Sequence, residues 1–272
     1  MIKIIATDLD GTLLQNGAQS VSERAIHQIN ELNKKGIVFA AASGRQYPNL
    51  FRLFGKASEN MGFICENGAL VMYQGHVISK SSMDRTLALN LIEDIYNRKG
   101  CEVLISGEAT SYVKPKTESY LYRMTSIVKN NVTVVDDFAS IPEDIIKVSA
   151  YEKTGIVNGS ASYFTKKWQD HAKCTVSGIG WIDFVNPDVN KGTALKSLAT
   201  YLKIPHDKTM AFGDNYNDLE MLDFVKYGFV MDNAVEDIRS RYVYHTPLVE
   251  QTLEEVLSGI TPAILKEKER AY

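Results

Sequence analysis

Two parts of this 272-residue chain alternate apolar strand-like runs with helical patterns, and this alternation limits the fold more than any other feature. In the first part, the runs 2–7 and 37–42 flank a stretch in which apolar residues recur at helical spacing. After residue 190 the alternation returns, with strand-like runs at 209–212 and 228–231. Strands that alternate with helices are typical of parallel sheets, so we predict a doubly wound, Rossmann-like α/β fold.

The middle of the chain breaks this alternation. A polar amphipathic helical stretch at 87–98 is followed by several strand-like stretches, a second helical stretch and a last pair of strands. This change of pattern predicts an inserted α+β cap domain over residues 83–185. We therefore assign residues 1–82 and 186–272 to one core domain, which would be the catalytic domain.

Composition excludes several classes of function. The formal net charge of −3 gives no sign of a general nucleic-acid or acidic-membrane binder. The three cysteines lie far apart without CxxC spacing, which predicts neither a disulfide framework nor a zinc site. No apolar run approaches the ~18 residues of a membrane span, and the start lacks the pattern of a secretory signal. We expect a cytoplasmic monomer or weak homodimer that binds neither nucleic acid nor membranes.

Four polar clusters fall near the ends of predicted strands or at the start of a predicted helix. They are residues 8–12 (DLDGT), 43–45 (SGR), 190–192 (NKG) and 213–218 (GDNYND). Ligands of doubly wound sheets bind at the carboxyl ends of the strands, so we expect these clusters to converge. Phosphoryl transfer needs a nucleophile, an acid/base group, a divalent cation, and positive or hydrogen-bonding groups around the transferred oxygens. The clusters contain candidates for each of these parts.

Asp8 and Asp10 are the candidate nucleophile and acid/base group. Their side chains point to opposite sides of an extended strand unless the strand breaks at Leu9, which Gly11 favours. One carboxylate then attacks phosphorus while the other donates and later removes a proton. Magnesium prefers oxygen ligands, which suits Asp8 together with Asp214. Two aspartates at this spacing are by themselves more often turn or cap residues, but the other three clusters favour chemistry.

The remaining clusters are weak signals individually. Ser43 and Gly44 precede a predicted helix, where a hydroxyl and free backbone N–H groups can hold a phosphate oxygen, although such a pair is usually a turn with a cap. Lys191 can supply a fixed positive charge, although an isolated lysine is usually solvated. For Asp218 two roles stay open, as the N-cap of the following helix or as a residue that supports the catalytic groups.

With all four clusters in this order, the sequence resembles the haloacid dehalogenase superfamily, and in particular its Cof-type sugar-phosphatase-like branch, over nearly the whole chain. The gap of roughly 145 residues between the second and third clusters is where that branch has a large α/β cap. The resemblance implies that Asp8 forms an aspartyl phosphate and that Asp10 is the general acid/base. It also implies a Mg²⁺ ion held by Asp8, by Asp214 and by the main-chain carbonyl of Asp10.

Further roles around the phosphate follow from the same resemblance. Ser43 and Lys191 would hold the phosphoryl oxygens, while Asn217 and Asp218 would orient magnesium-bound water or Lys191. The resemblance also implies residues that lie near the phosphate or the leaving group, or that support the loop of Asp214. They are Leu9, Gly44, Arg45, Asn67, Gly68 and Asn215.

The sequence departs from the family pattern in two places. Asp232 stands where the family more often has glycine before Asn-Ala, which bears on the shape of that loop. Residues 246–249 replace a more usual acidic segment that contains Gly-Val. Neither departure touches a residue with an assigned catalytic role.

The predicted function is a magnesium-dependent phosphatase that hydrolyses small phosphorylated metabolites, such as sugar phosphates or similar monoesters. Two alternatives stay open. A sugar phosphomutase would use the same aspartyl phosphate, whereas a non-catalytic phospho-metabolite sensor would need no nucleophile. The sequence does not select the substrate, because aromatic residues in the insertion are more often core than ligand contacts. These residues are Tyr112, Tyr120, Tyr122, Trp168 and Trp181.

Overall fold

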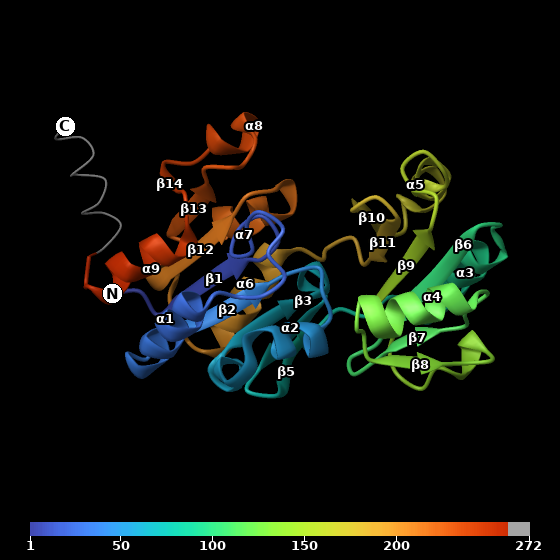
Figure 1. Ribbon diagram of the computed structural model, residues 1–272, viewed down its shortest axis with the longest axis horizontal. Coiled ribbons are helices and arrows are strands. Elements are labelled where there is room, and N and C mark those ends of the chain that lie inside the picture. Colours follow the sequence, from blue (N-terminus) through green and yellow to red (C-terminus); the bar gives the residue numbers. More distant parts are fainter. Residues whose placement is uncertain (261–272) are drawn as a thin grey trace. The chain divides into compact units, whose positions relative to one another are not determined.

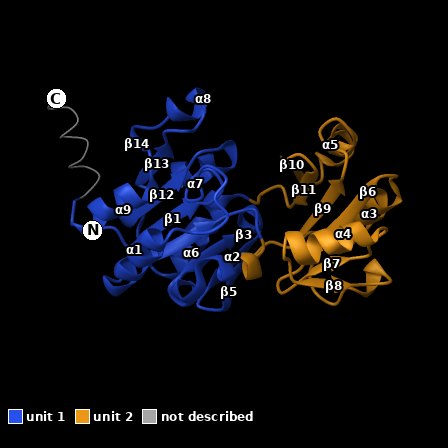
Figure 2. Cartoon of the chain, viewed as in Figure 1, with its two compact units in different colours: residues 1–45, 50–79, 190–272 blue, residues 46–49, 80–189 orange. Residues whose placement is uncertain are grey.

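A computed structural model describes residues 1–260 as two compact units (Figures 1 and 2). Unit 1 comprises residues 1–45 and 50–79 and the chain from residue 190, and unit 2 comprises residues 46–49 and 80–189. The predicted limits of the insertion, 83 and 185, fall inside unit 2. The last twelve residues of the predicted core domain, 261–272, lie outside the described residues. Within the described part of the chain, no helix is long and apolar enough to cross a membrane.

An eight-stranded sheet forms the centre of unit 1, in the order β14-β13-β12-β1-β2-β3-β4-β5. Neighbouring strands are parallel from β14 to β3, whereas β3 and β4 are antiparallel. The strands are β1 (Ile4–Asp8), β2 (Val38–Ala42), β3 (Gly62–Cys65), β4 (Leu70–Tyr73), β5 (His76–Lys80), β12 (Thr209–Gly213), β13 (Tyr227–Met231) and β14 (Tyr244–Thr246). The prediction of a doubly wound parallel sheet is therefore confirmed.

Helices lie on both faces of this sheet. The chain passes from β1 to β2 through α1 and moves in the opposite direction from β12 to β13 through α7. Because such crossovers are right-handed, these connections place helices on opposite faces. Helices α6 and α7 pack on the face that carries Ile4 and Ala6, and α1 packs against β2 and α9. The helices are α1 (Glu23–Lys34), α2 (Tyr47–Phe54), α6 (Lys191–Tyr201), α7 (Leu219–Phe224), α8 (Glu236–Arg239) and α9 (Val249–Leu257).

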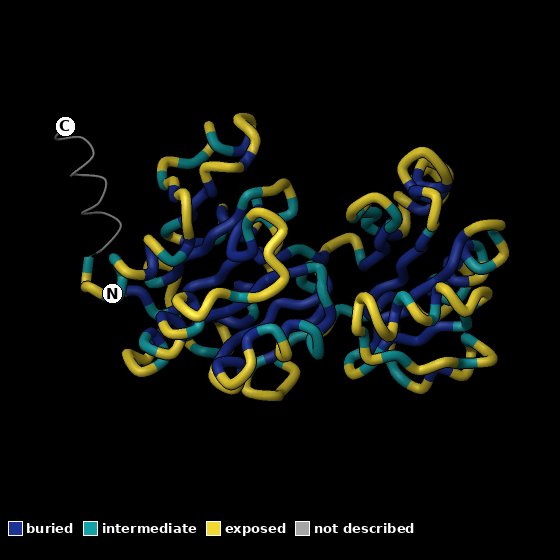
Figure 3. The backbone as a smooth tube through the Cα atoms, viewed as in Figure 1, coloured by how far each residue is buried: buried dark blue, intermediate teal, exposed yellow. Residues whose placement is uncertain are grey.

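The alternation of side chains along β1 explains the direction of Asp8. Ile4 and Ala6 contact the core cluster that includes residues of α6 and α7. Side chains two positions apart share a face, so Asp8 points to the same side as Ile4 and Ala6. All five residues of β1 are buried, as are most residues of its neighbouring strands (Figure 3). A carboxylate therefore ends a buried strand on the side of the sheet that α6 covers.

Unit 2 is an α+β structure with a sheet in the order β10-β11-β9-β6-β7-β8. Helices α3 and α5 pack on one face of this sheet, and α4 packs on the other. The strands are β6 (Cys101–Ser106), β7 (Ser111–Val113), β8 (Val132–Val134), β9 (Lys147–Glu152), β10 (Lys173–Ser177) and β11 (Trp181–Val185). The helices are α3 (Arg85–Asn97), α4 (Glu118–Tyr122) and α5 (Ala161–Trp168). The amphipathic stretch predicted at 87–98 is thus α3.

Candidate active site

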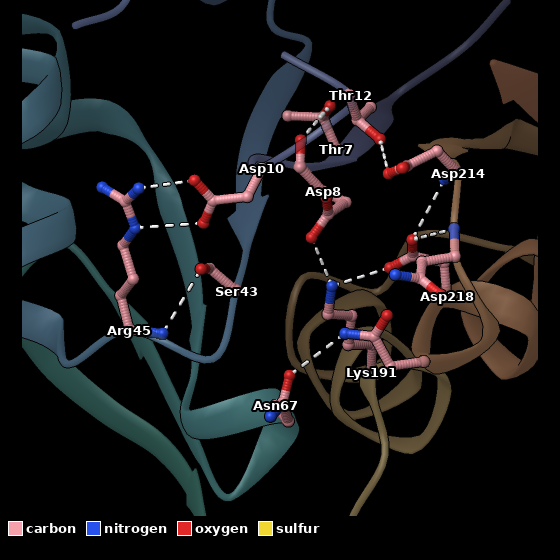
Figure 4. A network of polar contacts seen from close by, with 12 residues as sticks. Thr7, Asp8, Asp10, Thr12, Ser43, Arg45, Asn67, Lys191, Asp214 and Asp218 are labelled. Atoms are coloured by element: carbon pink, nitrogen blue, oxygen red, sulfur yellow. Dashed lines mark hydrogen bonds and ion pairs between the residues drawn. The ribbon is translucent and has the colours of Figure 1, made fainter. Parts of the chain in front are cut away.

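The four polar clusters meet at the carboxyl-terminal edge of the unit 1 sheet (Figure 4). Asp8 is the last residue of β1, and Asp214 directly follows the neighbouring strand β12. Lys191 is the first residue of α6, whose N-cap Asn190 accepts a hydrogen bond from the backbone N–H of Thr193. Sheet order and the packing of α6 therefore bring together residues from distant parts of the chain.

Lys191 is fully buried, and its ammonium group bridges two carboxylates. Its Nζ donates to Oδ1 of Asp8 at 2.5 Å and to Oδ1 of Asp218 at 2.7 Å. Burial disfavours a charged ammonium, but the two carboxylates outweigh this effect and raise the pKa of Lys191. The lysine is therefore a fixed positive charge and not a solvated surface residue.

The contacts of Asp218 bear on the two roles that its sequence position leaves open. Its Oδ1 accepts from Lys191, and its Oδ2 accepts from the backbone N–H groups of Asp214 and Asn215, each at 3.1 Å. Although Asp218 stands at the N-cap position of α7, its side chain makes no capping bond to that helix. Asn215 and Asp218 form a capping box at the short turn before α7, in which the Asp218 side chain accepts from the backbone N–H of Asn215. Asp218 thus holds the lysine and shapes the loop that carries Asp214.

Asp8, Asp214 and Asp218 bring carboxylate oxygens within 4.8 Å of one another. Three ionised carboxylates that face one ammonium leave a formal charge of −2. Burial raises the pKa of Asp8 to about 7, against the lowering effect of Lys191, and burial also raises the pKa of Asp214. One divalent cation would balance this excess of negative charge.

Oxygen ligands for such a cation are available at Asp8 and Asp214. Lys191 occupies Oδ1 of Asp8, and the hydroxyl of Thr12 donates to Oδ1 of Asp214 at 2.7 Å. One oxygen of each carboxylate already has a partner, and the other can bind a cation. A site made of carboxylate oxygens fits Mg²⁺. Asp218 belongs to the acidic cluster, but we do not assign it as a ligand, because both of its oxygens already accept hydrogen bonds.

Two residues with no role assigned from the sequence, Thr12 and Asn233, hold this site together. The Thr12 hydroxyl orients Asp214, and Nδ2 of Asn233 donates to the carbonyl of Gly11 at 2.9 Å. A side-chain carbon on Gly11 would lie 2.3 Å from Oδ2 of Asp214, and the φ of Gly11 is +99°. The position of Thr12 in the first cluster, directly after Gly11, could have indicated that it belongs to the site. Asn233 belongs to the Asn-Ala pair of the family pattern, but only the fold brings its loop beside the end of β1.

Asp10 points away from Asp8 and toward Arg45 (Figure 4). Strand β1 ends at Asp8, and the chain turns there with the Leu9 side chain fully buried, but this turn does not bring the carboxylates of Asp8 and Asp10 together. Arg45 donates to the two carboxylate oxygens of Asp10 from Nη2 at 2.6 Å and from Nε at 3.2 Å. The side chain of Asp10 is 62% exposed, so it lies beside the acidic cluster and not within it.

The loops after β2 and β3 meet beside the acidic cluster. The backbone N–H of Asn67 donates to the carbonyl of Ser43 at 3.0 Å, and Nδ2 of Asn217 donates to Oδ1 of Asn67 at 3.3 Å. A side-chain carbon on Gly44 would lie 3.1 Å from the amide of Asn67. The hydroxyl of Ser43 accepts from the backbone N–H of Arg45 at 3.3 Å. These contacts join the second predicted cluster to the fourth.

Gly68 and the side chain of Leu9 help to position the loops of the site. Gly68 has a φ of +110°, and a side-chain carbon on it would lie 2.3 Å from the carbonyl oxygen of Asn190. This close approach seats the loop after β3 against the start of α6. The side chain of Leu9 is fully buried, and its carbonyl accepts from the N–H groups of Thr12 and Leu14. The substrate contacts predicted for Leu9 would therefore involve its main chain.

A doubly wound sheet that gathers acidic residues and a buried lysine at its carboxyl edge is the framework of an α/β enzyme. Residues 5–252 match the model of the haloacid dehalogenase-like hydrolase family. The chain belongs to this family and is a hydrolase, which confirms the family resemblance seen in the sequence.

Named relatives and solved structures are similar over most of the chain. The Escherichia coli K12 protein 5-amino-6-(5-phospho-D-ribitylamino)uracil phosphatase YbjI is 26% identical over 233 residues, which cover 86% of each chain. YitU of Bacillus subtilis 168 carries the same activity name and is 26% identical, over 87% of this chain and 88% of its own. The sugar phosphatase BT4131, of subclass IIB of the superfamily, shares the fold with a TM-score of 0.72 at 19% identity, over 93% of this chain and 98% of its own.

Proposed function

We propose that this hydrolase is a magnesium-dependent phosphatase that removes phosphate from small phosphorylated metabolites. The observation that carries the proposal is the Asp8 carboxylate at the end of β1, held by buried Lys191 and flanked by Asp214. A carboxylate fixed in this way can act as a nucleophile toward phosphorus. The phosphatase names of YbjI and YitU, each 26% identical to this chain, support the proposal.

The proposed reaction has two steps. In the first, a carboxylate oxygen of Asp8 bonds to phosphorus as the bond from phosphorus to the leaving oxygen breaks, and Asp10 gives its proton to that oxygen. In the second, water bonds to phosphorus while Asp10 removes its proton, which releases inorganic phosphate and restores the Asp8 carboxylate. Lys191 and Ser43 offset charge on the phosphoryl oxygens. Asp10 has to leave its ion pair with Arg45 to reach the leaving oxygen.

We assign Mg²⁺ as the cation, held by the carboxylates of Asp8 and Asp214 and by the carbonyl of Asp10. When bound, it neutralises negative charge where the carboxylate and the phosphate meet. Thr12 fixes the orientation of Asp214 through its hydrogen bond, and Asp218 fixes Lys191. The neighbours of the ligands are therefore part of the proposed site.

We propose a phosphate ester of a sugar or a sugar alcohol as the substrate class. YbjI and YitU are named for a substrate with a phosphoribityl group, and BT4131 is named a sugar phosphatase. These names share a phosphate ester on a hydroxylated carbon chain. In this proposal unit 1 carries the chemistry, and unit 2 is the cap that selects the leaving group.

Turnover of para-nitrophenyl phosphate tests the magnesium requirement. In the presence of a chelator the rate should fall at least about tenfold and return when Mg²⁺ is added, because the acidic cluster repels a phosphate dianion unless a cation is bound. Full activity in chelator would contradict the requirement. The ratio of inorganic phosphate released to sugar phosphate consumed distinguishes hydrolysis from transfer to another hydroxyl. A mutase would release little inorganic phosphate.

The variant Thr12→Val tests whether the hydroxyl supports the metal site. Valine keeps the shape of threonine but cannot donate to Asp214. We expect the Mg²⁺ concentration for half-maximal rate to rise about 10- to 100-fold, with a smaller change at saturating Mg²⁺. The exposed Thr125→Val is the matched control. If Thr12→Val and the wild type need equal Mg²⁺, Thr12 does not act on the metal site.

A further inference from the structure

Unit 2 contains a cavity of about 500 Å³ lined only by its own residues. It lies between the start of β6, the end of β9 and the segment 116–127, which includes α4 and the π-helical turn Arg123–Ile127. Small-molecule sites have volumes of roughly 300–1,000 Å³, so the cavity is large enough for a ligand. Tyr122 and Ile127 line it and are 63% and 59% exposed, so solvent reaches it.

Aromatic side chains form one side of this cavity. The ring centroids of Tyr120 and Tyr151 are 5.7 Å apart with 21° between the ring planes, and those of Tyr151 and Trp181 are 4.7 Å apart. Tyr120 and Tyr151 line the cavity. The Tyr120 hydroxyl donates to the carbonyl of Val103 at 3.1 Å, which satisfies its polar end. Both tyrosine side chains are largely buried, so a planar ring bound here would contact the exposed edges of their rings.

The charged groups around the cavity are mainly cationic. Lys116, Arg123 and Lys153 line it together with one acid, Glu102. The carboxylate of Glu102 accepts from the backbone N–H of Lys116 at 3.0 Å and from the hydroxyl of Thr117 at 2.9 Å. The ammonium group of Lys116 already donates to the carbonyl oxygens of Arg98 and Cys101, so Arg123 and Lys153 are the cations that favour an anionic ligand.

Arg123 has hydrogen-bonding capacity that the described residues do not use. Its guanidinium carbon lies 5.1 Å from the centroid of the Tyr151 ring. Its Nε is buried, with no hydrogen-bond partner among residues 1–260. This nitrogen is shielded from the cavity, so an anion in the cavity would have to bind the terminal nitrogens of the guanidinium group. Arg123 also begins a π-helical turn, a rare structure that is frequent at functional sites.

We propose that this cavity binds a small planar anion, namely an aromatic or heteroaromatic ring that carries a carboxylate group. The ring would lie beside Tyr120 and Tyr151, and the carboxylate would accept hydrogen bonds from Arg123 and Lys153. The site uses none of the residues of the candidate active site and goes beyond the proposed phosphatase function.

Orotate, a pyrimidine carboxylate with no phosphate to hydrolyse, is the probe, and uracil is the matched neutral ring. Calorimetric titration of the full chain should show orotate binding at least about tenfold tighter than uracil. Arg123→Met and Tyr151→Leu should each weaken orotate binding at least about tenfold. Lys167→Met removes a cation beside another aromatic ring of unit 2, that of Tyr163, and should leave the affinity unchanged.

Thermal melting of each variant shows whether it is folded, and Arg123→Met alone suffices if Tyr151→Leu fails to fold. No orotate binding at millimolar concentration would overturn the proposal, as would binding that Arg123→Met leaves unchanged. Asp8→Asn, in the candidate active site, should leave orotate affinity unchanged. A changed orotate affinity in Asp8→Asn would assign the probe to the candidate active site and would also overturn the proposal.

Discussion

Asp8→Asn is expected to lower kcat for para-nitrophenyl phosphate by at least about a thousandfold. The amide keeps the size of the carboxylate, and its oxygen can still accept from Lys191 at the position of the present 2.5 Å contact. It lacks the negative charge that attacks phosphorus, so the chemical step is lost while the surrounding structure stays. Steady-state rates at saturating Mg²⁺ measure the effect.

Stability and a surface control separate this effect from misfolding. Asp8→Asn should melt at or above the wild-type temperature in chelator, because one of three clustered carboxylates has lost its charge. Asp207→Asn alters an exposed aspartate of unit 1 and should keep kcat within about twofold of the wild type. A folded Asp8→Asn protein with wild-type kcat would rule out Asp8 as the nucleophile.

Lys191→Met is expected to reduce the free energy of unfolding by about 3–5 kcal/mol. Lys191 is 0% exposed, and its Nζ holds Asp8 and Asp218 at 2.5 and 2.7 Å. Removing the ammonium leaves two buried carboxylates next to each other without a counter-charge. Urea denaturation in the presence of chelator measures the loss without a contribution from bound metal.

A second substitution tests the cause of that loss. Adding Asp218→Asn to Lys191→Met removes one of the unpaired charges, so it should recover part of the stability but none of the activity. Lys196→Met, at an exposed position on the same helix, should change stability by less than about 0.5 kcal/mol. If the double variant is less stable than Lys191→Met alone, charge repulsion is not the cause.

The central strands of unit 1 were predictable because buried parallel strands are nearly continuous apolar runs. β1 and β12 are buried at every residue and end in polar clusters. Several other strands were missed, among them β4, β5 and β14 of unit 1 and β8 of unit 2. β5 has no buried residue and only two apolar residues, Val77 and Ile78, and β8 is a short, mostly exposed strand of unit 2. Neither strand carries a pattern long enough to be recognised.

The convergence of Asp8 and Asp214 could be expected from one rule, since parallel strands present their carboxyl ends at the same edge. Lys191 begins a helix, and its place beside them follows from the packing of α6. The individual contacts could not be predicted. The hydrogen bond from Asn233 to Gly11 and the ion pair of Asp10 with Arg45 join loops whose separation in the sequence follows no rule. Such contacts depend on the paths of the loops, which residue spacing does not encode.

A phosphate group bound covalently to Asp8 would be the most direct sign of the proposed chemistry. Wild-type protein is mixed with Mg²⁺ and excess para-nitrophenyl phosphate, quenched in acid within milliseconds, and digested for mass spectrometry. We predict a phosphorylated peptide that contains Asp8, formed as the first nitrophenol is released and absent from Asp8→Asn. Phosphate found only on another residue, or continued turnover with no phosphorylated peptide at any quench time, would contradict a covalent role for Asp8.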